Sequence, residues 1–135
     1  MYFDIYSEKV IEHLMCPRNV GSMPDADAQG IAGDPNCGDS LTIYIKVKDW
    51  IIEDISFHVF GCAAAIASSS MTTELAKGKS LQEALLITEE DITEALGGLP
   101  EHKLHCSVLG ATALKNAVTN YYDKVSFHDW DKKST

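Results

Sequence analysis

The sequence has no long apolar run and no surplus of basic residues. Its apolar stretches are short and interrupted by Lys, Asp or Ser, and the opening residues MYFDIYSEKV lack a basic region followed by an apolar block. Acidic residues number 20 against 11 basic ones, which gives a formal net charge of -9, and no Lys or Arg cluster stands out. We therefore expect a cytoplasmic protein with no membrane contact and no nucleic-acid partner.

Cysteine pairs of the CxxC type are also absent. The four cysteines stand at positions 16, 37, 62 and 106, and in a reducing compartment they favour metal ligands or nucleophiles over disulfides. Without a CxxC pair an ordinary zinc finger is not expected, so the fold must assemble any shared site. An apolar share of 45% over 135 residues predicts a single domain over residues 1–135. A flexible tail over about residues 125–135 is compatible with this prediction.

Apolar periodicity predicts an α+β fold. Residues 5–15 carry one apolar helical stripe that stops before Pro17. Residues 17–38 are rich in Pro, Gly, Asp and Asn and predict a loop with one short strand near residues 29–32. The stretch LTIYIKVK alternates strictly, IIEDISFHVF follows after a short turn, and together they predict a β-hairpin.

The register of this hairpin follows from its apolar faces, because a slip of one residue would place core side chains opposite polar ones. Extended to the open end of the hairpin, the best register sets Gly38 opposite Cys62 and brings Cys37 close to Cys62. Neighbouring strands lie about 4.8 Å apart, so the two thiols could share a ligand. The predicted pairs are Leu41 with Val59, Ile43 with Phe57, Ile45 with Ile55, and Lys46 with Asp54.

Four helices are predicted after the hairpin, which makes a small antiparallel sheet of two to three strands packed against helices. The first runs from Cys62 to Lys77 with Gly78 as its C-cap. Two capping patterns, S-x-x-E at residues 80–83 and T-x-x-D at residues 88–91, start the next two, and the second of these ends at Gly97-Gly98. The last helix is predicted over residues 107–123, with Cys106 at its N-terminal edge.

Helix starts favour thiolates, because unpaired backbone N–H groups stabilise negative charge there. Together with neighbouring groups, the cysteines form a candidate soft-metal site. Each member also has a simpler explanation: a buried cysteine can act as a small apolar residue, and the polar members can fix a turn, cap a helix or face water. We expect Cys16, His13, His58, His102 and His128 to be structural. The candidate ligands are Cys37, Asp39, Cys62, His105 and Cys106, with Lys103 beside them.

Three stretches, DPNCGDSLTIYIKV, FHVFGCAAAIASSSMTTELAKGKSLQEAL and GLPEHKLHCSVLGATALKNAV, resemble the signature blocks of the IscU/NifU family of iron–sulfur cluster assembly scaffolds. The resemblance implies a non-enzymatic scaffold on which a [2Fe–2S] cluster is built from iron and desulfurase-derived sulfur. It implies Cys37, Cys62 and Cys106 as ligands, with Asp39 or His105 completing the set. It also implies that Cys106, assisted by Lys103, accepts persulfide sulfur.

The resemblance implies partners as well. They are a cysteine desulfurase, recipient apo iron–sulfur proteins, a ferredoxin, a frataxin-like protein and a second copy of the chain in a homodimer that pools ligands. The family's Leu-Pro-Pro-Val-Lys segment, which an Hsp70-type chaperone recognises, reads LPEHK here at residues 99–103, which argues against dedicated release by that chaperone.

Two other functions compete with the scaffold. Three cysteines with Asp39 or His105 equally suit tetrahedral zinc, as in a SufU-like protein that accepts sulfur and activates a desulfurase. The chain lacks the long insertion before the third cysteine that marks that branch. A cysteine hydrolase using Cys106 and His105 is disfavoured, because adjacent residues at a helix start tend to point apart and no third orienting group is evident.

Overall fold

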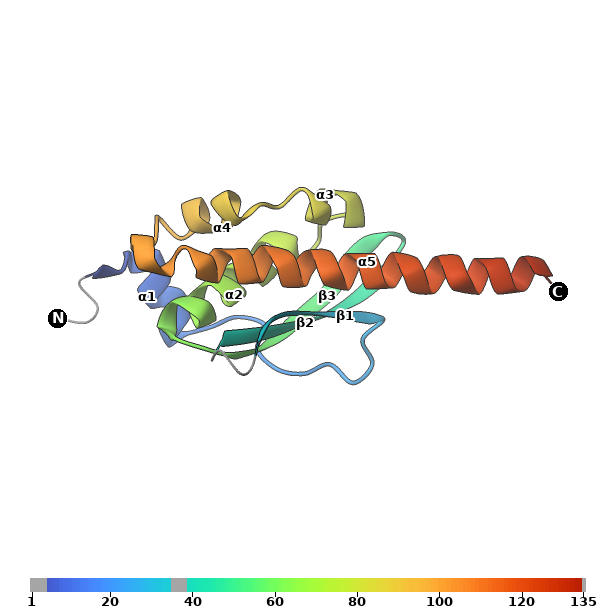
Figure 1. Ribbon diagram of the computed structural model, residues 1–135, viewed down its shortest axis with the longest axis horizontal. Helices are drawn as coiled ribbons and strands as arrows, with labels where there is room; N and C mark the ends of the chain where they lie inside the picture. The colour runs from blue at the N-terminus through green and yellow to red at the C-terminus, as the bar shows by residue number, and fades with distance from the viewer. Residues whose placement is uncertain (1–4, 35–38, 135) are drawn as a thin grey trace.

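The computed structural model describes residues 5–34 and 39–134, and it has the predicted α+β order of a helix, a three-stranded sheet and four further α-helices (Figure 1). Strands β1, β2 and β3 form an antiparallel sheet in that order. Helices α2 to α5 lie on one side of it, and α5 runs along the long axis of the molecule (Figure 1). The elements are α1 (Glu8–Met15), β1 (Ala28–Asp34), β2 (Asp39–Lys48), β3 (Ile51–Phe60), α2 (Ala63–Ala76), α3 (Leu81–Leu85), α4 (Glu89–Ala95), the 3-10 helix η3 (Glu101–Lys103) and α5 (His105–Ser134).

The hairpin of β2 and β3 has the predicted register. All four predicted pairs are present, from Leu41 with Val59 to Lys46 with Asp54, and an irregularity after Lys46 shifts the pairing toward the turn. Asp49 and Trp50 form the two-residue turn with φ values of 55° and 66°, the left-handed conformation that such hairpin turns require. The predicted pairing of Gly38 with Cys62 lies outside the described residues.

The main core lies between the sheet and α5. Ile43, Ile45 and Phe57 are buried on the inner face of the sheet, against Leu114 and its neighbours on α5. Burying each such side chain contributes about 1.5–3 kcal/mol relative to leaving it in water. The closest approach is at Gly30 of β1, where a Cβ atom would lie 2.2 Å from the backbone nitrogen of Ala117. Helix α5 is therefore held directly on the β1 backbone.

Side chains of α5 also cover the free edge of β1. A row of donors spaced four residues apart along the helix reaches backbone carbonyls at alternate positions of the strand region. Such a row satisfies an edge that could otherwise pair with another chain. The contacts are Asn116 Nδ2 to the carbonyl of Ile31 at 2.9 Å, Asn120 Nδ2 to that of Gln29 at 2.7 Å, and Lys124 Nζ to that of Asp27 at 3.0 Å.

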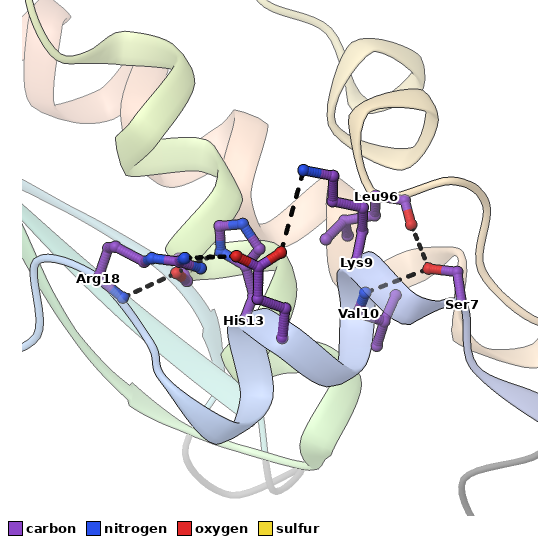
Figure 2. A network of polar contacts seen from close by, with 8 residues as sticks. Ser7, Lys9, Val10, His13, Arg18 and Leu96 are labelled. Carbon is purple, nitrogen blue, oxygen red and sulfur yellow. Dashed lines mark hydrogen bonds and ion pairs between the residues drawn. The ribbon is translucent and has the colours of Figure 1, made fainter.

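Polar contacts attach α1 to the helical layer (Figure 2). The hydroxyl of Ser7, the N-cap of α1, donates to the carbonyl of Leu96 at the end of α4. Near the other end of α1, the hydroxyl of Ser70 on α2 lies 2.7 Å from Nδ1 of His13 and accepts the backbone N–H of Arg18 at 2.9 Å. The burial of His13 and its contact with Ser70 give this histidine a packing position, distant in sequence from the candidate ligands.

The helix limits match the predicted caps, with differences at both ends of the chain. Both predicted capping boxes, at Ser80 and at Thr88, are formed. Helix α1 begins at Glu8, later than predicted, and α5 runs from His105 to Ser134, well past the predicted end at residue 123. After Gly110 the sequence contains no glycine or proline to end the helix. Among the described residues, no helix combines the length and the apolar character needed to cross a membrane.

Candidate metal centre

Three potential ligands converge from three elements of the fold. Asp39 begins β2, Cys62 is the N-cap of α2, and Cys106 lies in the first turn of α5. One ligand atom from each of the three lies within 4.8 Å of the other two. The two sulfur atoms are 3.9 Å apart. Two thiols and a carboxylate at this spacing can hold a metal ion or an iron–sulfur unit between them.

His105 lies beside this group. Its Nε2 atom is 3.4 Å from Oδ2 of Asp39 and 3.7 Å from Sγ of Cys106. The expectation that adjacent side chains at the helix start point apart is therefore wrong for this pair, because His105 is the first residue of α5 and its ring turns back toward Asp39. Both contacts use the same ring nitrogen, so Asp39 cannot hold the opposite nitrogen as the orienting acid of a nucleophilic triad does.

The other predicted site residues divide by position. Cys16, at the end of α1, is exposed and is not part of the group. Cys37 lies outside the described residues. The positive charge of Lys103 is a small influence on both thiols: it adds slightly to the lowering of the pKa of Cys62, and it opposes, without reversing, the rise in the pKa of Cys106.

The Cys106 thiol is held in its protonated form. Cys106 has no exposed surface, and its pKa is raised to about 12, chiefly by burial and further by the negative charges of a neighbouring Cys62 thiolate and the Asp39 carboxylate. The expectation that a helix start favours the thiolate therefore fails for Cys106, because a pattern along the sequence does not reveal the desolvation that burial brings.

The pKa of Cys62 shifts in the opposite direction, although its sulfur lies only 3.9 Å from that of Cys106. Burial again acts to raise its pKa, but hydrogen bonds from the backbone N–H groups of Ala65 and Ala64 and from the Cys106 thiol outweigh that influence. The net result is a lowered pKa, as expected for a thiol at the N-cap of a 14-residue helix. The two thiols of the site thus differ both in solvent exposure and in the direction in which their pKa is shifted.

Two glycines leave room for Asp39. A Cβ atom on Gly61 would lie 2.9 Å from Oδ1 of Asp39, and one on Gly33, whose φ is +88°, would lie 2.4 Å from the Asp39 carbonyl oxygen. Neither glycine stood out in the sequence, although Gly61 directly precedes Cys62. Their place beside a candidate ligand required the strand pairing to be known.

Ser68 is a further residue of the site that sequence analysis missed. It is fully buried on α2, and its hydroxyl donates to the backbone carbonyl of Cys106 at 3.1 Å and to that of Ala65 at 3.2 Å. The bond to Cys106 joins the helix that begins at Cys62 to the helix that carries Cys106. Three consecutive serines in the sequence gave no signal that the first one differs from the others.

The site opens beside two hollows in the surface. One, of about 430 Å³, lies between β1 and α5, and the other, of about 690 Å³, lies between α4 and α5. His105 and Val108 line both of them. The candidate ligands therefore lie at one end of the molecule, where a partner can approach from either side of the α5 start.

Comparison with known proteins places this geometry in a family. The model of the NifU-like N terminal domain matches residues 5–128. This chain belongs to the NifU-like N-terminal domain family. It is 60% identical, over 120 residues, to the iron–sulfur cluster assembly scaffold protein IscU 1 of Archaeoglobus fulgidus, covering 89% of this chain and 78% of that protein.

A further relative supports the assignment, and a solved structure shows the same fold. The IscU scaffold protein of Escherichia coli strain K12 is 51% identical over 123 residues, which cover 88% of this chain and 95% of that protein. The crystal structure of a NifU-like N-terminal protein from Brucella abortus superimposes with a TM-score of 0.68 at 21% identity, covering 91% of this chain and 98% of that one. The predicted resemblance to the family is confirmed, and the fold with it.

Proposed function

We propose that this NifU-like protein is a scaffold on which an iron–sulfur cluster is assembled and from which it is passed to other proteins. The observation that carries the proposal is the convergence of Asp39, Cys62 and Cys106, whose ligand atoms lie within 4.8 Å of one another. The relatives that share 60% and 51% of their residues with this chain are named as scaffolds of this kind. The scaffold role is non-enzymatic, and the cluster is its cargo.

The proposed ligand set joins these residues to Cys37. Cys37, Cys62 and Cys106 supply three thiolates to a [2Fe–2S] cluster, and Asp39 or His105 supplies the fourth ligand. The positions of Asp39 and His105 support this choice, since Nε2 of His105 lies 3.4 Å from Oδ2 of Asp39 and 3.7 Å from Sγ of Cys106. An oxygen or nitrogen ligand in place of a fourth thiolate weakens the hold on the cluster, which suits a protein that must release it.

Sulfur entry is proposed at Cys106, assisted by Lys103. Its thiol would take the outer sulfur of a desulfurase persulfide and leave the desulfurase cysteine as a thiol. Because Cys106 is fully buried, the structure around it must move before that sulfur can reach its thiol. Mass spectrometry after incubation with a cysteine desulfurase and cysteine tests this step: persulfide found mainly on the exposed Cys16 would contradict it.

The partners follow from the proposed function. A cysteine desulfurase and recipient apoproteins are required by it, whereas a ferredoxin, a frataxin-like protein and a ligand-pooling homodimer are finer proposals. In the LPEHK segment, Glu101 and His102 lie in an exposed 3-10 turn, so weak affinity for an Hsp70-type chaperone is expected. A reducing cytoplasm is the proposed compartment, since it keeps the thiols available as ligands.

A zinc-binding, sulfur-accepting protein is the alternative, because the same residues suit tetrahedral zinc. Anaerobic reconstitution with iron, sulfide and thiol, followed by ultraviolet–visible spectroscopy, separates the two functions. A spectrum typical of a [2Fe–2S] centre supports the scaffold. A colourless product that keeps zinc and takes up no iron would refute it.

A further inference from the structure

The groove between α4 and the start of α5 has an apolar floor. It measures about 690 Å³, and Leu104 and Val108 line it with 43% and 41% of their surfaces exposed. Leu104 directly precedes α5 and Val108 lies in its first turn, so the two residues are four positions apart in sequence. Gly97 and Gly98, both with positive φ, line the groove where α4 ends and add no side chain that could fill it. Exposed apolar side chains inside a groove are typical of an interaction site.

The rim of the same groove is acidic. Glu89, Glu90 and Glu94 line it and are exposed. Across the part of the chain that the structure describes, none of their carboxylates takes part in an ion pair or a side-chain hydrogen bond. Lys115 lines an adjacent hollow with Glu89 and Glu90 but forms no ion pair with them among these residues. The rim therefore carries negative charge that is available to an incoming cation.

We propose that this groove binds a segment of a partner protein that presents apolar side chains flanked by lysine or arginine. The floor matches the apolar side chains, and the three carboxylates match the basic ones. A second copy of this chain fits poorly, because each copy carries a net charge of -9 and the acidic rims would repel. An anionic membrane surface is disfavoured for the same reason.

The position of the groove gives this contact a role beside the metal centre. His105 lines the groove, and its ring lies 3.7 Å from the Cys106 sulfur. A segment held on Leu104 and Val108 therefore lies next to the candidate ligands without occupying them. Whether the bound partner delivers sulfur or receives a cluster rests on the proposed function. The binding itself does not, so the test uses the metal-free protein.

Fluorescence anisotropy of labelled peptides tests the groove on the full metal-free chain. The first probe carries three leucines flanked on each side by two arginines, the second replaces its leucines with serine, and the third replaces its arginines with glutamate. We expect the first probe to bind, and the serine and glutamate probes to bind about tenfold more weakly or not at all. Absence of binding by the first probe, or equal binding by the serine probe, would overturn the proposal.

Matched variants separate the groove from general attraction to an acidic protein. The double variant Glu90→Gln with Glu94→Gln, and separately Val108→Ser, should each weaken binding of the first probe about fivefold or more. The control Glu53→Gln with Asp123→Asn removes the same net charge from exposed positions on β3 and the middle of α5 and should change binding less than about twofold. Equal weakening in the control and the rim variant would refute a specific groove.

Hydrogen exchange on the wild-type chain gives a readout that needs no variant. The first probe should slow exchange in residues 93–108 and leave β3 unchanged. Protection confined to other segments would overturn the proposal even if the affinity is as expected. If the peptide binds as predicted and the protein assembles no cluster, the groove stands and the proposed scaffold function fails.

Discussion

The hydroxyl of Ser68 offers a direct test of whether the joint between α2 and α5 sets the distance between the two site thiols. Ser68 lies on α2, two turns after the N-cap Cys62, and donates to the carbonyl of Cys106 at 3.1 Å. The next residue, Ser69, is an ideal control. It is also buried, and its hydroxyl donates to the Ala65 carbonyl at 2.7 Å, within its own helix.

The magnitude follows from this difference. Each Ser→Ala change removes a buried hydroxyl, for which one lost hydrogen bond costs about 1 kcal/mol. Each also gains up to about 0.5 kcal/mol of helix propensity, so the two variants should unfold within about 1 kcal/mol of each other. Only Ser68→Ala loses the bond between helices. If that bond holds Cys106 near Cys62, about 1 kcal/mol of metal-binding free energy is lost, which is about fivefold in affinity.

The assay is zinc competition with a chromophoric chelator under anaerobic conditions, using wild type, Ser68→Ala and Ser69→Ala. We expect Ser68→Ala to bind zinc about fivefold more weakly and Ser69→Ala to match wild type. Urea unfolding of the metal-free proteins provides the stability comparison. Equal zinc affinities for the two variants would show that the joint between the helices does not position the ligands, and a loss in both would assign the effect to α2 as a whole.

Four other predictions test the site. Cys62→Ser and Cys106→Ser should each abolish stable cluster assembly after reconstitution, whereas Cys16→Ser should leave it intact; equal loss in all three would contradict the ligand assignment. Asp39→Ala should lengthen the half-life of the cluster in air and slow its transfer to an apo-ferredoxin, and a shorter half-life would leave Asp39 with a structural role alone. Gly61→Ala should shift the cluster half-life in the same direction as Asp39→Ala, because its Cβ would lie 2.9 Å from Oδ1 of Asp39 and 2.8 Å from Cβ of Ala65, and an unchanged half-life would refute that crowding argument. Because the pKa of Cys106 is raised from 9.0 to about 12, the unfolded chain loses this proton first, so the free energy of unfolding of the metal-free protein should fall by up to about 1.4 kcal/mol per pH unit between these values; Cys106→Ala should remove that slope in urea unfolding, and an identical slope in both proteins would contradict the shift.

Local patterns predicted the fold well because each of them has one physical cause. The alternation of residues 41–48 allows one register that buries both apolar faces, and that register is observed. The capping boxes at Ser80 and Thr88 depend on residues three positions apart and are equally local. The end of α5 was not predictable in this way, because neither a glycine nor a proline marks it.

The convergence of three candidate ligands was predictable from the sequence, whereas their acidity was not. The sequence pointed to Asp39, Cys62 and Cys106, and these residues converge. The pKa of Cys106 depends on how completely neighbouring elements exclude water, which is a property of the assembled fold and leaves no pattern along the chain. The same holds for Gly61, because only the folded structure shows that its Cα lies close to the Asp39 carboxylate and leaves no room for a side chain.

Helix α5 connects the site to the rest of the molecule. Its first turn carries His105 and Cys106, while Ala117, three turns later, lies against the backbone of Gly30 in β1. Strand β1 pairs in turn with β2, which begins at Asp39. A continuous helix and a paired strand thus join two candidate ligands through the core. We therefore expect packing of the sheet against α5 to set the spacing of Asp39 and Cys106, with core side chains distant from the candidate metal centre contributing to it.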